Sequence, residues 1–115
     1  MLGNEIRTKR ESLKVDDRRY SLRQVATRIG IEPAYLSKIE RNEVAPPGEE
    51  TIKRLSRDLE LDPDVMLALA GKVSSDLQEV IRKRPLLFSK MLRALKDAPD
   101  HAILDVVREV SDGDW

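Results

Sequence analysis

The chain has 115 residues, enough for one domain with an appendage, and its 40% hydrophobic content suffices for a helical bundle. It has no cysteine, which excludes disulfides and zinc-thiolate sites, and no apolar stretch near the roughly 18 residues of a membrane span. The 21 basic residues balance the 21 acidic ones, and a net charge of zero taken alone argues against a nucleic-acid partner.

Two helices are expected in the first 30 residues. The first runs from about Asn4 to Leu13, because Ile6 and Leu13 lie seven residues apart and share one face. The second begins at Ser21, which forms a Ser-x-x-Gln capping box with Gln24. The seven residues KVDDRRY connect these two helices.

A third helix, called the reading helix below, follows after a tight turn. Gly30 ends the second helix, since glycine adopts a left-handed conformation at little cost, and Pro33 suits the first turn of the next helix. The reading helix is expected to run to about Arg41, with Leu36 and Ile39 facing inward. Its outward face is small, polar and basic: Ala34, Ser37, Lys38 and Arg41. Small residues permit approach to a major groove, and Ser and Lys donate to bases or phosphates, so this face is expected to contact DNA.

Two more helices are expected before residue 72. One starts near Gly48, after the break at Ala45-Pro46-Pro47, and the other starts at Asp62-Pro63 and ends at Gly71. The earlier of the two has an apolar stripe made of Ile52, Leu55 and Leu59.

Seven small or apolar positions and the run YLSKIER at residues 35–41 carry a family likeness: Val25, Ala26, Ile29, Gly30, Ile31, Leu36 and Ile39. In these residues the chain resembles the lambda-repressor-like helix-turn-helix family, often called XRE. The resemblance implies an all-α fold, with a five-helix DNA-binding domain in residues 1–71 and a C-terminal helical extension in residues 72–115. It also implies a partly buried, bidentate ion pair between Arg10 and Glu40, which would join the first helix to the reading helix. The alternative is two unrelated surface charges.

Two departures from the family pattern bear on DNA contact. The KVDDRRY connection is several residues longer than usual and lies beside the DNA backbone in the family's docking mode, so Arg18 and Arg19 are candidate phosphate clamps. The alternative is a pair of solvated charges balanced by Asp16 and Asp17. Glu32 stands where Ser or Thr usually caps the reading helix, and it is either a weak cap or a specificity residue that accepts from a cytosine amine.

The charge distribution supports DNA contact by the first part of the chain. Residues 1–41 hold 10 Lys or Arg against 6 Asp or Glu, whereas residues 42–115 hold 11 against 15. So modest an excess predicts weak non-specific binding and a reliance on dimerisation. The residues expected to contact DNA are Arg18, Arg19, Ser21, Arg23, Gln24, Glu32, Ala34, Tyr35, Ser37, Lys38, Arg41 and Asn42.

The extension is expected to hold three helices, which begin near Ser75, Pro85 and Pro99. They carry more apolar residues than three short helices bury against one another. Part of the surplus is expected to pack on the first domain, and part to pair two subunits across a two-fold interface. The interface candidates are Phe88, Met91, Leu92, Leu95, Ile103, Val106, Val107 and Val110.

No enzymatic, metal or cofactor chemistry is indicated. His101 is the only histidine, and although Asp100 and Asp105 lie near it, no second nitrogen or thiolate is placed to share a metal. The five glycines are scattered and form no phosphate-cradling loop. Since the N-terminus also lacks a signal-peptide core, we expect a cytoplasmic protein that is not an enzyme and does not contact membranes.

Two functions remain. The first is a sequence-specific transcriptional regulator, most simply a repressor, whose homodimer reads a near-palindromic operator on double-stranded DNA in successive major grooves about 34 Å apart. The alternative is an antitoxin-type module whose extension holds a partner protein and whose DNA binding is autoregulatory.

Overall fold

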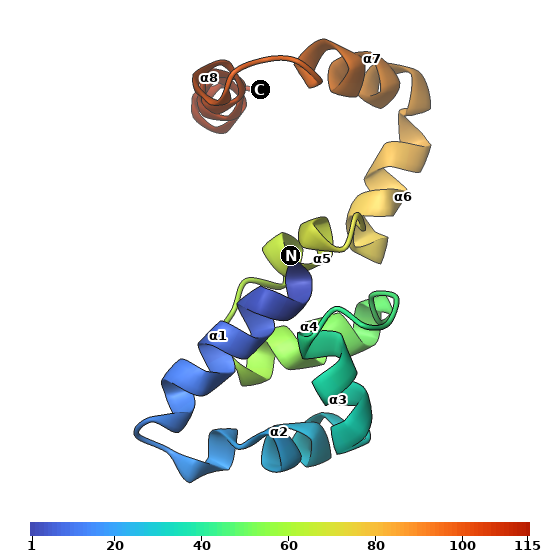
Figure 1. Ribbon diagram of the computed structural model, residues 1–115. Coiled ribbons are helices and arrows are strands. Elements are labelled where there is room, and N and C mark those ends of the chain that lie inside the picture. The colour runs from blue at the N-terminus through green and yellow to red at the C-terminus, as the bar shows by residue number, and fades with distance from the viewer. The chain divides into compact units, whose positions relative to one another are not determined.

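The computed structural model describes all 115 residues and contains helices but no strands (Figure 1). The all-α class expected from the sequence is therefore confirmed. The chain divides into two compact units, Met1–Ser75 and Asp76–Trp115. The expected domain boundary after Gly71 stays a prediction. None of the helices is long and apolar enough to cross a membrane.

The first unit contains the five expected α-helices and one short 3-10 helix: α1 Leu2–Lys14, η1 Arg18–Tyr20, α2 Leu22–Ile29, α3 Pro33–Glu40, α4 Glu49–Asp58 and α5 Pro63–Leu69. Within it α2 contacts α3 and α4, α1 contacts α3, and α4 contacts α5. The remaining helices are α6 Ser75–Lys83, α7 Pro85–Leu95 and α8 Asp100–Asp112.

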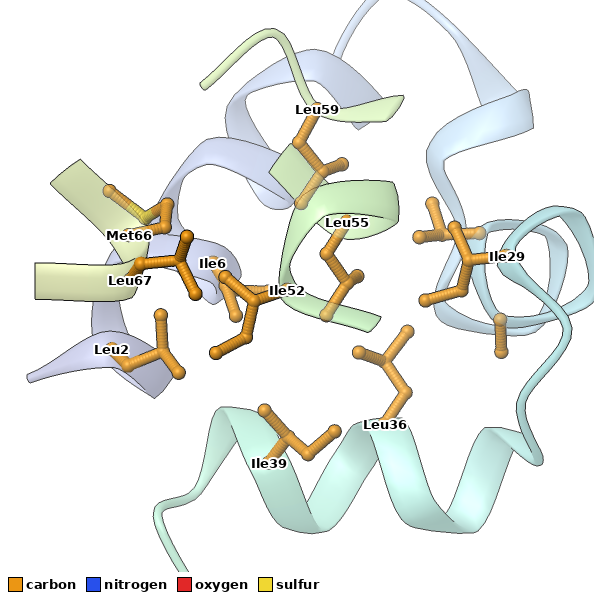
Figure 2. Close-up of a cluster of buried hydrophobic side chains, with 12 residues drawn as sticks. Leu2, Ile6, Ile29, Leu36, Ile39, Ile52, Leu55, Leu59, Met66 and Leu67 are labelled. Carbon is orange, nitrogen blue, oxygen red and sulfur yellow. The ribbon is translucent and has the colours of Figure 1, made fainter. Parts of the chain in front are cut away.

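One apolar core holds the first unit together (Figure 2). Figure 2 shows Leu36 and Ile39 pointing from α3 toward Ile52 and Leu55 of α4. Each fully buried side chain of this kind stabilises the fold by roughly 1.5–3 kcal/mol, so the inward face of α3 is firmly anchored. The core consists of Leu2, Ile6, Val25, Ala26, Ile29, Leu36, Ile39, Ile52, Leu55, Leu59, Met66 and Leu67.

The start and end of α2 follow the local signals of the sequence, with one exception. Gly30 closes the helix with a φ of 80°, which favours glycine over any other residue. At the start, Ser21 Oγ accepts a hydrogen bond from the Gln24 N–H at 3.3 Å. The N–H of Ser21 donates instead to the carbonyl of Arg18 in η1, at 3.1 Å. Only half of the expected capping box is present, because η1 occupies the donor that the other half would need.

The helix α1 begins at Leu2, two residues earlier than expected, because its first turn packs against the end of α3. Leu2 is buried in the core, and Gly3 touches α3. A Cβ atom at Gly3 would lie 2.3 Å from the carbonyl oxygen of Ile39 and 2.8 Å from that of Glu40. Only glycine therefore permits this approach of α1 to α3.

We expect Gly3→Ala to lower the free energy of unfolding by about 1–3 kcal/mol, because the added methyl group displaces backbone at the joint of α1 and α3. The sign is informative, since alanine in a helix is ordinarily more stable than glycine by roughly 0.5–1 kcal/mol. Urea unfolding measures the change. Thr8→Ala, at an exposed position of the same helix, is the control and should leave stability unchanged or slightly raised. A Gly3→Ala protein as stable as the wild type would show that the joint is loose.

The helices of the second unit expose their apolar residues. No residue of α6, α7 or α8 is buried. Among the interface candidates, Phe88, Leu95 and Ile103 are half-buried and the other five are exposed. The apolar surplus expected from the sequence therefore lies at the surface of this unit.

Candidate nucleic-acid interface

The helix α3 presents the two faces that its sequence predicts. Leu36 and Ile39 are 0% and 3% exposed, whereas Ala34 and Lys38 lie on the surface. Ser37 between them is half-buried. The ammonium group of Lys38 makes no ion pair or hydrogen bond within the chain, so it is available to an outside acceptor. A small residue beside a free cation on an anchored helix suits approach to a DNA groove.

The residues at the two ends of α3 are less available for contact with DNA than the residues at its centre. Arg41 caps the C-terminal end, and its side chain is engaged by Glu43 at 2.9 Å and by the carbonyl of Ser37 at 3.3 Å. Tyr35 is half-buried against the core. At the N-terminal end Glu32 makes no capping hydrogen bond, and its exposed carboxylate has no partner within the chain. The helix thus begins with a free negative charge and ends with a compensated positive one.

Asn42 has a structural task that its sequence position does not reveal. It adopts a left-handed conformation, with a φ of 58°, immediately after the C-cap of α3. Its Oδ1 accepts from the N–H of Gly3 at 3.1 Å, and its Nδ2 donates to Asn4 Oδ1 at 2.7 Å. These bonds tie the end of the reading helix to the start of α1, so the side chain expected to contact DNA already has partners inside the protein.

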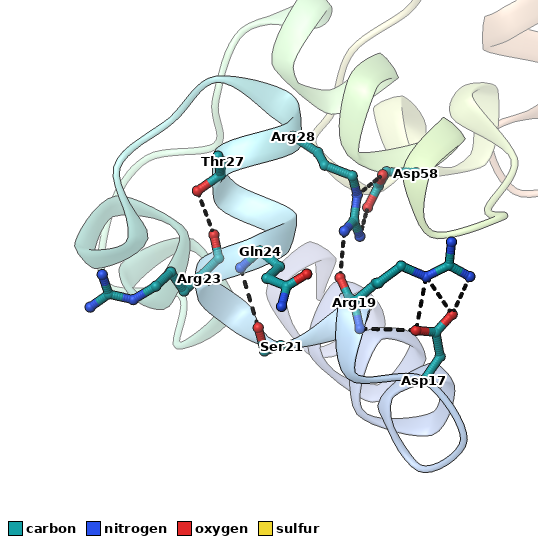
Figure 3. A network of polar contacts seen from close by, with 8 residues as sticks. All are labelled: Asp17, Arg19, Ser21, Arg23, Gln24, Thr27, Arg28 and Asp58. Carbon is teal, nitrogen blue, oxygen red and sulfur yellow. Dashed lines mark hydrogen bonds and ion pairs between the residues drawn. The ribbon is translucent and has the colours of Figure 1, made fainter.

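The two arginines of the connection differ although they are adjacent. The guanidinium of Arg19 binds Asp17 through two nitrogens, at distances of 2.7–3.1 Å, as Figure 3 shows. These hydrogen bonds lower the pKa of Asp17, so the pair contributes fully above the ordinary pKa of an aspartate and is lost as the pH falls through the lowered pKa of Asp17. Asp17 also accepts from the N–H of Arg19 at 2.9 Å and thereby caps η1. Arg18 is exposed and has no partner within the chain.

A second pair of charges fastens α2 to α4. Arg28 binds Asp58 through two nitrogens at 2.8 and 2.9 Å, and its guanidinium lies 5.2 Å from the centre of the Tyr20 ring. The same guanidinium donates to the carbonyl of Arg19 (Figure 3). This network holds η1 in place beside α2, and with it the position of Arg18. Sequence reasoning overlooked Arg28 and Asp58, because no local pattern links residues 30 positions apart.

The Arg10 and Glu40 side chains meet, as the family resemblance implies. Their two hydrogen bonds measure 2.7 and 2.9 Å, and the side chains are only 7% and 3% exposed, so the pair is fully rather than partly buried. A third nitrogen of Arg10 donates to the carbonyl of Tyr20 at 3.2 Å. The bonds to Glu40 raise the pKa of Arg10, against the opposing effect of burial. One guanidinium therefore connects α1, η1 and α3.

Three cations without partners remain on consecutive elements of the interface: Arg18 of η1, Arg23 of α2 and Lys38 of α3. Figure 3 shows the Arg23 side chain directed away from the network around Asp17 and Asp58. Gln24, also on α2, is exposed and uses only its backbone N–H in the cap with Ser21. The structure thus separates the expected contact residues into a free set and a set that has internal partners.

An anchored helix, a left-handed glycine turn before it and free cations around it define a helix-turn-helix DNA-binding domain. The chain belongs to the XRE-type helix-turn-helix family, HTH_3, whose model matches residues 6–66. This match confirms the resemblance noted in the sequence, and the protein is a DNA-binding transcription regulator of that family.

The solved structure of a SinR protein/SinI protein complex contains a chain that is similar to this one. The match has a TM-score of 0.50 and 24% sequence identity, and it covers 84% of this chain and 95% of that chain. At this identity the likeness shows the fold alone, which is the lambda-repressor-like all-α fold. A comparison with curated proteins gave no match.

Proposed function

We propose that this protein is a repressor that reads a near-palindromic operator as a homodimer, with α3 of each subunit in a major groove. The observation that carries the proposal is the exposed face of α3, where Ala34 and the free Lys38 stand opposite the buried Leu36 and Ile39. Contacts from Arg18 and Arg23 to phosphates would set the position of the helix on the duplex.

A selection from randomised double-stranded DNA with the purified full chain tests this proposal. The expected result is an inverted repeat whose half-sites lie about one helical turn apart, because two-fold protein symmetry imposes that spacing. Recovery of a single, unrepeated half-site would contradict the dimer, and recovery of no motif would contradict sequence-specific reading.

We expect Arg18→Ala to weaken binding to all DNA sequences alike. Loss of one phosphate contact should flatten the slope of log affinity against log salt by about one unit for each subunit bound. Electrophoretic or fluorescence titrations at several salt concentrations measure this slope.

The double variant Asp17→Asn, Arg19→Gln is the matched control for this prediction. It removes a charge pair that is satisfied within the protein, and asparagine keeps the oxygen that caps η1. The slope should therefore stay at the wild-type value. An unchanged slope in Arg18→Ala, or an equal loss in the double variant, would show that the phosphate contact lies elsewhere.

The dimer is proposed to form through α7 and α8, with domains assigned as residues 1–71 for DNA binding and 72–115 for association. The exposed apolar residues of these helices support this assignment. Sedimentation at micromolar concentration, comparing the full chain with one that ends at Ser75, is the test. A monomeric full chain would contradict it.

A second candidate function is that of an antitoxin-type module, whose exposed apolar helices hold a different protein while the first unit binds DNA for autoregulation. The similar solved structure is a complex of two different proteins, SinR and SinI, which supports this alternative. A toxin encoded in a neighbouring reading frame, and a stable complex of its product with the full chain but not with the chain ending at Ser75, would favour it over the repressor.

A further inference from the structure

The second unit divides its charges between its helices. Residues 82–96, which include α7, hold six Lys or Arg and no acidic residue. Residues 97–115, which include α8, hold six Asp or Glu and a single Lys or Arg, which is Arg108. Two adjoining helical segments therefore carry opposite charges.

Both helices are amphipathic, and neither has its apolar face fully covered. On α7 the apolar face includes Met91 and Leu92, which are 40% and 57% exposed. On α8 it includes Val107 and Val110, which are 54% and 60% exposed. Each helix consequently lacks a partner for an apolar stripe, and the charges beside that stripe are of opposite sign on the two helices.

The complementary charges do not meet within one chain. The helices α7 and α8 share at most a marginal contact. The ion pairs of this unit are local, from Arg82 to Glu79 and from Arg108 to Asp105, both at 3.6 Å. The remaining cations, among them Lys90 and the C-cap residue Lys96, have no ion-pair partner.

We propose that α7 of one copy packs on α8 of a second copy, so that two-fold symmetry makes the contact twice. In one chain, α7 and α8 could only bury one apolar stripe against the other. In two copies, the four helices form a bundle with a shared apolar core and with opposite charges facing each other. This inference rests on the proposed dimer and goes further, because it specifies which helix meets which and selects a second copy of this chain as the occupant.

Charge reversal at exposed residues tests the pairing directly. One variant carries Lys90→Glu and Lys96→Glu, which places two carboxylates on the basic segment and lowers the net charge of residues 82–96 from +6 to +2. The other carries Glu109→Lys and Asp112→Lys, both on α8, which changes the net charge of residues 97–115 from −5 to −1. Each variant alone should dimerise at least roughly tenfold more weakly than the wild type, because like charges then face each other. An equimolar mixture should form a heterodimer with near wild-type affinity, since both of its contacts again join opposite charges.

Sedimentation gives the dissociation constants, and native mass spectrometry separates heterodimer from homodimer by mass. Circular dichroism checks that helicity is unchanged, and the neutral variant Lys90→Gln, Lys96→Gln should weaken the dimer less than the reversal. If both variants dimerise like the wild type, α7 of one copy does not pair with α8 of the other: this inference fails and the proposed homodimer stands. If each is weakened and the mixture is not rescued, the two helices do not pair between copies. If the wild type is monomeric, the proposed dimer fails as well.

Discussion

Arg10→Met is expected to lower the free energy of unfolding by roughly 3–5 kcal/mol. The carboxylate of Glu40 is almost fully buried and accepts both of its hydrogen bonds from this one guanidinium. Without Arg10 the carboxylate would have to ionise unpaired in the core or take up a proton. Urea unfolding measures the loss, which should appear in the midpoint with the slope unchanged.

The control for Arg10→Met is the double variant in which Glu40→Leu is added. Replacing both partners by apolar residues removes the unpaired charge, so the double variant should recover most of the lost stability. Its DNA affinity should still fall below that of the wild type, because the link from α1 to the reading helix is gone. A single variant with an unchanged melting temperature and unchanged operator affinity would show that the pair does not hold the reading helix.

The sequence predicts α2, the turn and α3 correctly because their signals are local. Gly30 takes the left-handed conformation expected of it, and Pro33 occupies the first turn of α3. The inward pair Leu36 and Ile39 follows from helical spacing alone. The cap, the glycine at the helix end and the apolar stripe are all local signals, so the structure of this short segment can be predicted from its sequence alone.

Contacts between distant residues leave no such signal. Gly3 and Asn42 are 39 positions apart, and nothing in either neighbourhood indicates that they share a hydrogen bond. The start of α1 at Leu2 depends on that contact, and for this reason the sequence places the start of the helix two residues too late, at Asn4. The pair of Arg10 and Glu40, 30 positions apart, was open to prediction only through the family resemblance.

The availability of charges also depends on tertiary geometry. Arg18 and Arg19 are neighbours of the same residue type, yet only Arg19 has a carboxylate within reach. Asp16 and Asp17 are equally near in sequence, and the 3-10 turn selects Asp17 as its cap and as the partner of Arg19. A count of charged residues treats these arginines as equal. The structure distinguishes the arginine that is paired within the protein from the one whose guanidinium is free.

Ala34→Glu, on the exposed face of α3, is expected to abolish specific DNA binding. Ala34 is exposed on the first turn of α3, two residues after Glu32. A second carboxylate there would face the phosphates of the groove, and like charges across an interface cost several kcal/mol, which corresponds to a loss of affinity on the order of 100-fold or more. Titration of the selected operator measures the loss.

This loss cannot be ascribed to unfolding, because an acidic residue in the first turn is favourable to the helix dipole and should leave the melting temperature unchanged or slightly raised. Ala68→Glu, which adds the same charge at an exposed position of α5, is the control and should retain most of the affinity. Lys38→Ala removes a donor instead of adding repulsion and should cost about 1–3 kcal/mol of operator affinity. If Ala34→Glu and Lys38→Ala both bind the operator as the wild type does, another surface of the protein reads the DNA.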